Sequence, residues 1–190
     1  SDGSSNKLMS YNMSSGAISE ISTFATGVNS WAAGGNNAVD SYGRVAYTIS
    51  GTKLFKINLD DGTEESVTLD ANPISIGWDS KNKKLYAVNN TDIVSINTST
   101  GAFTVISSGT VPSTANYVQF IAPNDQRYYI QGSDVTRVFS LTDGSLLGSF
   151  TSILRAMPPG AVVLGSASTD DDESIAINIA DPTSQIIKLG

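Results

Sequence analysis

The stretch that decides the fold runs from residue 84 to residue 101 and reads KLYAVNNTDIVSINTSTG. It holds two short segments rich in aromatic and β-branched residues, KLYAVN and DIVSIN, with a polar link between them. Such segments favour β-strands. The polar run that follows ends at Gly101, and glycine takes the positive φ that tight turns between antiparallel strands need. A further short segment, AFTVIS, follows the glycine, so the stretch predicts consecutive antiparallel strands.

The same pattern recurs along the chain. The turn glycines stand at positions 16, 62, 101 and 144, at spacings of 46, 39 and 43 residues. An apolar residue precedes each glycine by five positions: Tyr11, Ile57, Ile96 and Phe139. An asparagine or serine precedes each by four positions: Asn12, Asn58, Asn97 and Ser140. A tyrosine recurs after an upstream polar turn in three repeats: Tyr47, Tyr86 and Tyr129. Four strands in about 40 residues is the period of a β-propeller blade.

The predicted fold is therefore all-β: a β-propeller of four-stranded antiparallel blades, with about four repeats in one domain spanning residues 1–190. The units fall at about 7–24, 25–69, 70–108, 109–152 and 153–190, of which the first and last are partial. The first unit supplies the two outer strands of a blade and the last unit supplies three inner ones. We therefore expect an incomplete ring or part of a longer chain, with a closed four-bladed ring as the alternative.

The alignment makes a prediction about burial. Ile57, Ile96 and Phe139 should occupy one structural column and be buried alike, and Tyr47, Tyr86 and Tyr129 should occupy another. A slip of one residue would move every side chain to the opposite face of its sheet, so either set divided between core and solvent would contradict the register. We expect each tyrosine to pack against the next blade.

The repeat resembles those of known propellers. LYAVNNTDIVSIN at residues 85–97 is similar to the YVTN-type repeat of bacterial and archaeal surface-layer and secreted proteins. The turn NTSTG at 97–101 resembles that of quinoprotein-like blades, although the tryptophan usual after the glycine of such blades is missing here. The resemblance implies a propeller of secreted or cell-surface proteins, and the missing tryptophan argues against a quinone cofactor.

Composition limits the chemistry. The chain has no cysteine and no histidine, so it lacks thiolate ligands, a thiol nucleophile and the usual general base. A net charge of −7 gives no basic footprint for nucleic acid. No apolar run approaches the ~20 residues that span a bilayer, so we expect no membrane insertion. Abundant serine, threonine and asparagine with few lysines and arginines favour an extracellular or cell-surface location.

Three kinds of candidate site remain. Asp170, Asp171, Asp172 and Glu173 form an acidic run that could bind calcium, since hard cations take clustered oxygen ligands, but a solvated turn is the more conservative interpretation. Sequons for N-glycosylation begin at Asn12, Asn89 and Asn97, about as many as the composition gives by chance. Trp31 and Trp78 could stack on sugars or partners, although large aromatics near these strands often pack between blades.

No motif assigns a catalytic residue, and apart from calcium no cofactor is expected. The leading hypothesis is a non-catalytic extracellular propeller for binding, adhesion or surface assembly, with a protein, a carbohydrate or neighbouring subunits as partner. One alternative is part of a secreted propeller enzyme of hydrolase, lyase or lactonase type, with its site at the central channel. Another is a structural subunit of an extracellular filament or layer. We also expect exposed strand edges and apolar faces near residues 7–24 and 174–190, and hence self-association.

Overall fold

The computed structural model describes residues 6–12, 14–24, 36–111, 118–131, 135–151, 162–168, 174–180 and 183–189. For the last three ranges, and at a few earlier strand positions, only the backbone is described. All regular structure in these residues is β, in seventeen strands that follow one another as antiparallel meanders. Short turn-closed segments of aromatic and β-branched residues have formed strands throughout, as the sequence predicts.

The strands form five sheets. The first sheet holds β1 (Asn6–Tyr11) and β2 (Ile18–Phe24). The second holds β3 (Asn37–Asp40), β4 (Val45–Ser50), β5 (Lys53–Asn58) and β6 (Glu64–Thr68). The third holds β7 (Ser75–Asp79), β8 (Lys84–Asn89), β9 (Asp92–Ile96) and β10 (Phe103–Ser107). The fourth holds β11 (Val118–Ala122), β12 (Arg127–Gln131), β13 (Val135–Ser140) and β14 (Leu146–Thr151). The fifth holds β15 (Val162–Ser168), β16 (Ser174–Ala180) and β17 (Thr183–Leu189).

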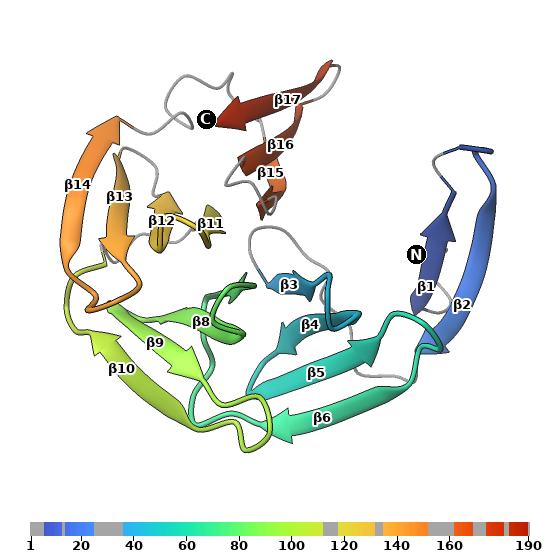
Figure 1. The fold of residues 1–190 in the computed structure, drawn as a ribbon, viewed down its shortest axis with the longest axis horizontal. Coiled ribbons are helices and arrows are strands. Elements are labelled where there is room, and N and C mark those ends of the chain that lie inside the picture. The colour runs from blue at the N-terminus through green and yellow to red at the C-terminus, as the bar shows by residue number, and fades with distance from the viewer. Residues whose placement is uncertain are drawn as a thin grey trace.

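The sheets stand around a common centre like the blades of a propeller (Figure 1). The first strand of each four-stranded sheet lies innermost, where β3 contacts β7, β7 contacts β11, and β11 contacts β15. The last strand of each lies at the periphery. The arc in Figure 1 is open between the β15–β17 sheet at one end and the β1–β2 sheet at the other. The predicted fold class, an all-β propeller of antiparallel four-stranded blades, is confirmed.

The predicted register is also confirmed for the apolar column. Ile57, Ile96 and Phe139 lie opposite equivalent residues of the preceding strand and are all buried. The tyrosines share the neighbouring register position, but their burial differs: Tyr47 and Tyr86 are buried, whereas Tyr129 is half-buried. None of the three lies in solvent, so the register stands. On the side that Tyr129 faces, the next sheet is β15–β17, whose side chains lie outside the described residues.

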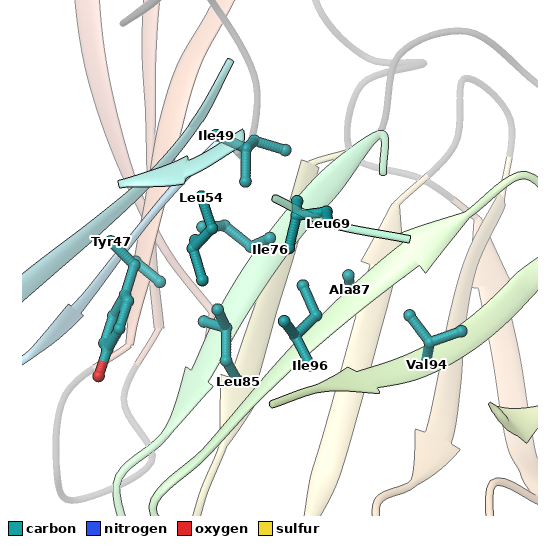
Figure 2. Close-up of a cluster of buried hydrophobic side chains, with 10 residues drawn as sticks. Tyr47, Ile49, Leu54, Leu69, Ile76, Leu85, Ala87, Val94 and Ile96 are labelled. Atoms are coloured by element: carbon teal, nitrogen blue, oxygen red, sulfur yellow. The ribbon is translucent and has the colours of Figure 1, made fainter. Parts of the chain in front are cut away.

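Among the described residues, two apolar cores join neighbouring sheets. The first joins the β3–β6 sheet to the β7–β10 sheet (Figure 2) and contains the following residues: Ala38, Tyr47, Ile49, Leu54, Leu69, Ile76, Leu85, Ala87, Val94 and Ile96. The second joins the β7–β10 sheet to the β11–β14 sheet and includes Tyr86, Tyr128 and Phe139. Tyr47 stacks on Trp78 of the next sheet with ring centroids 5.1 Å apart, and Tyr86 meets Tyr128 at 6.3 Å. These two tyrosines therefore pack against the next blade, as expected.

The turn between the third and fourth strands is the same in each repeat. The amide of each turn glycine donates to the carbonyl four residues earlier, and all four glycines have a φ between 72° and 80°. The preceding asparagine or serine caps the turn, as when Asn97 Oδ1 accepts from the amides of Ser99 and Thr100. The recurrent asparagine is thus explained by an Asx turn, in which its side-chain oxygen accepts backbone amides a few residues later and so favours a turn over a continued strand.

Candidate binding surface

The acidic run Asp170–Glu173 lies outside the described residues. Its calcium site therefore stays a prediction. Thermal melts with and without EDTA would test it, because an ion that binds only the folded chain raises the midpoint of unfolding. Among the residues that the structure does describe, no three histidine, cysteine, aspartate or glutamate side chains come together as a metal site. Trp31 also lies outside the described residues.

The asparagines of the sequons occupy turns. Asn12 and Asn97 are exposed at equivalent turns between β1 and β2 and between β9 and β10. Each side-chain oxygen accepts two backbone amides within its turn: from Ser14 and Ser15 for Asn12, and from Ser99 and Thr100 for Asn97. Asn89 ends β8 and is half-buried. Glycosylation at these positions remains a prediction.

Several acidic side chains serve the turns. Asp143 Oδ1 accepts from the amide and the hydroxyl of Ser145, and hydrogen bonds from Ser140 and Ser145 hold its pKa below the ordinary value. Asp61 Oδ1 accepts from the amide of Thr63, which lowers the pKa of that carboxyl in the same way. The pKa of Glu65 is lowered by Lys56, whose ammonium lies 2.6 Å from it. Ordinary turn and surface chemistry accounts for these carboxylates.

Two buried polar side chains, Asp79 and Tyr128, also have structural partners. Asp79 is fully buried at the end of β7 and accepts from the amides of Lys81 and Asn82 and from the side chains of Asn82 and Gln126. Because Gln126 belongs to the next sheet, this network ties two blades together. The Tyr128 hydroxyl donates to Gln119, and burial raises the pKa of this tyrosine. The described part of this region shows an inter-blade polar tie and no pairing of an acid with a base at a reaction site.

The β1–β2 sheet presents a different surface. Tyr11 lies opposite Ile18, and Met9 lies opposite Glu20, so alternation places all four on one face. Lys7 shares that face and its ammonium lies 2.8 Å from Glu20. Met9, Tyr11 and Ile18 are 46%, 60% and 67% exposed. We call these five residues, Lys7, Met9, Tyr11, Ile18 and Glu20, the β1–β2 apolar face.

The repeat shows why this exposure is unusual. Tyr11 is the equivalent of Ile57, Ile96 and Phe139, which are 0%, 6% and 0% exposed. Ile96 and Phe139 are covered by the preceding sheet, because each belongs to a core that it shares with that sheet. The opposite face of β1–β2 meets the following sheet, where the turn at Gly62 comes against Ser22. The β1–β2 apolar face therefore looks away from the β3–β6 sheet, and no other described sheet covers it.

The sequence indicated part of this surface. It placed Tyr11 in a column of core residues and predicted an exposed apolar face near residues 7–24. Sequence reasoning missed Met9 and Ile18 as members of that face. The signal was present in the alternation of β1, which puts Met9 beside Tyr11, and in the turn register, which puts Ile18 opposite it. The matching expectation for residues 174–190 concerns side chains outside the described residues.

Comparison with known proteins places the fold. No family model and no curated protein matches the sequence. Among solved structures, a protein of unknown function from Bacteroides thetaiotaomicron aligns over 90% of this chain and 47% of its own, with 14% identity and a TM-score of 0.60. A protein provisionally assigned as TolB from Agrobacterium tumefaciens covers 94% of this chain and 64% of its own, with 11% identity and a TM-score of 0.58.

A third similar structure is the glutaminyl cyclase of Myxococcus xanthus, which covers 80% of this chain and 70% of its own, with 15% identity and a TM-score of 0.57. The chain spans less than half the length of the solved structures ranked first in the comparison, between 21% and 47%. At these identities the likeness shows the fold alone. Together with the five sheets, it defines the chain as a β-propeller-like protein. The described residues include no helix of the length and apolarity needed to cross a membrane.

Proposed function

We propose that the chain is a non-catalytic binding or assembly module that acts outside the cell, and that the β1–β2 apolar face is its contact surface. One observation carries the proposal: Tyr11 is 60% exposed at a repeat position that is buried in the three sheets that follow. A side chain suited to the space between two blades here faces solvent. Burying an aromatic side chain of this size is among the largest single contributions to an interface.

The chemistry of the face supports the proposal. Tyrosine and methionine are enriched at the centres of protein interfaces, while charged residues tend to lie at the rim. The β1–β2 apolar face has this composition, with Met9, Tyr11 and Ile18 beside the ion pair of Lys7 and Glu20. The partner surface that fits it is another β-sheet face, because the equivalent positions of the other blades are covered by sheets. The extracellular location rests on the composition, which is rich in neutral polar residues and poor in lysine and arginine.

The test uses the chain itself as the probe, since it carries sheet faces of the required kind. We expect its weight-average mass, measured by light scattering, to rise with concentration. Ile18→Lys should reduce this association, because it replaces the most exposed apolar side chain of the face with a charged one. Tyr42→Lys is the matched control, because Tyr42 is 72% exposed but lies in a turn away from the face. A chain that stays monomeric at every concentration, or that associates equally after Ile18→Lys, contradicts the proposal.

A further inference from the structure

Strand β1 differs from its equivalents in how it is paired. β5, β9 and β13 occupy the third position of their sheets, and each pairs with a strand on both sides. β1 occupies the same position in the repeat, but among the described strands it pairs with β2 alone. Its inner edge, on the side away from β2, corresponds to the edge at which β5, β9 and β13 meet β4, β8 and β12. A row of backbone donors and acceptors without ladder partners is a template for another strand.

The groups on this inner edge follow from the register. The amide of Asn12 donates to the carbonyl of Ala17 across the turn, so it points toward β2. Alternate amides of an antiparallel strand point to opposite sides, so the amides of Met9 and Tyr11 point to the inner edge, while that of Ser10 points to β2. The next sheet shows the same arrangement, where Leu59, at the parity of Ile57, donates to the carbonyl of Arg44.

We propose that the inner edge of β1 binds an antiparallel strand of a β-hairpin from outside residues 1–190. The inference rests on the proposed function, but it concerns the edge of the sheet, whereas the proposed function concerns its face. The complete sheets define the pattern of the incoming strand. The residues opposite the equivalents of Tyr11 are Ala46, Leu85 and Tyr128, so the bound strand carries an apolar or aromatic residue there.

Among its described strands, a folded second copy offers no unpaired strand of the kind that pairs with β5, β9 and β13 in the complete sheets. Its own strands of this kind, β4, β8 and β12, are already paired on both edges, and β16 lies between β15 and β17. To donate one of them, the second copy would have to break a complete sheet. A hairpin that is free to add at an edge meets no such cost, and strand addition of this type is a common mode of peptide recognition.

The experiment uses a synthetic peptide with the sequence of residues 75–89, SIGWDSKNKKLYAVN, which carries β7 and β8 with their turn. Amide hydrogen exchange is followed residue by residue on the intact chain with and without this peptide. At saturation with the peptide, we expect the exchange rates of the Met9 and Tyr11 amides to fall to about one tenth or less. The exchange rate of the Ser10 amide should stay unchanged. A scrambled peptide should protect none of them.

Two variants isolate the edge from the face. Met9→Pro removes an inner-edge donor without removing a β1–β2 hydrogen bond, whereas Met9→Ala removes the same side chain and keeps the amide. We expect peptide binding to survive in Met9→Ala and to be lost in Met9→Pro. Equal binding by both variants, or no protection of Met9 and Tyr11 in the unchanged chain, overturns the proposal. Concentration-dependent protection of these two amides without peptide also overturns it if the protection persists in Ile18→Lys, because a second copy would then occupy the edge independently of the face.

The two proposals fail separately. If the chain does not self-associate but the peptide still protects Met9 and Tyr11, only the proposal for the β1–β2 apolar face is contradicted. If the chain self-associates but the peptide gives no protection, only the proposal for the inner edge of β1 is contradicted. The exchange measurement on the unchanged chain decides the edge proposal even if Met9→Pro fails to fold.

Discussion

At the scale of single residues, Thr48 shows how a blade core tolerates a polar atom. It lies on β4 with no exposed surface, opposite Phe55, on the side of the sheet that also holds Ala46 and Ile57. Its hydroxyl has no hydrogen-bond partner in the described structure. A buried hydroxyl without a partner loses its hydration and gains nothing in return, which costs about 1–3 kcal/mol.

Thr48→Val should therefore stabilise the chain. Valine has nearly the same shape and suits a β-strand, so we expect the free energy of unfolding in urea to rise by about 1 kcal/mol. Ser50→Val is a suitable control, because Ser50 is half-buried at the end of the same strand and its hydroxyl is closer to solvent. An unchanged or lower free energy for Thr48→Val would mean that the hydroxyl is hydrogen-bonded, for example to water.

At the scale of elements, the turn glycines do two things at once. Gly101 has a φ of 80°, and a Cβ at this position would overlap the carbonyl oxygen of Thr68 in the preceding sheet. Gly62 and Gly144 likewise approach the last strand of the sheet before them. Gly16 has a φ of 72°, but its Cβ would meet only the Tyr11 hydroxyl at 3.9 Å. The glycine spacing that revealed the repeat therefore also marks where one blade touches the next.

The matched pair Gly101→Ala and Gly16→Ala separates these two roles. Gly16→Ala should cost about 1–2 kcal/mol, because alanine is strained in the left-handed region. Gly101→Ala should cost about 3 kcal/mol or more, because it adds overpacking against backbone that cannot move without shifting a blade. Urea unfolding of both variants measures the difference. Similar losses would show that the sheets adjust to the added methyl group without cost.

The same turns predict an acid dependence of stability. The folded pKa of Asp143 lies below its ordinary value of 3.8, first because of Ser140 and then because of Ser145. A group with a lowered folded pKa contributes stability above its unfolded pKa and loses that contribution as the pH falls through the folded pKa. We expect Asp143→Asn to lower stability near neutral pH and to have a smaller effect below the folded pKa. A destabilisation that does not change with pH would contradict the role given to the carboxylate.

At the scale of the whole molecule, stability depends on how the sheets pack on one another. The β7–β10 sheet contributes side chains to the core on either side, and a single tyrosine can join two blades. Tyr47 stacks on Trp78 of the next sheet and is buried, and burial raises its pKa. Tyr129 has the same place in the repeat but is half-buried. A tyrosine at this repeat position therefore contributes differently to stability, depending on how completely the neighbouring residues cover it.

Tyr47→Ala should cost about 3–5 kcal/mol, the range for removing a large aromatic from a core. Tyr129→Ala should cost distinctly less, because part of its surface is already in water. Thermal or urea unfolding followed by tryptophan fluorescence measures both, and Trp78 reports directly on the loss of its stacking partner. A larger loss for Tyr129→Ala would show that the fifth sheet covers this side chain more completely than its exposure indicates.

The sequence by itself determined the strands, their register and the repeating turn, because these depend on neighbours only a few residues apart. The glycine and asparagine columns marked the turn, and alternation set which side chains share a face. Counting strands along the repeat also indicated an exposed face near residues 7–24, but only the tertiary structure decided which side chains that face holds and which faces the neighbouring sheets cover. Tyr11 and Phe139 satisfy the same local pattern, yet one is exposed and the other buried. The difference arises because burial of a blade face depends on a second sheet, which local sequence does not specify.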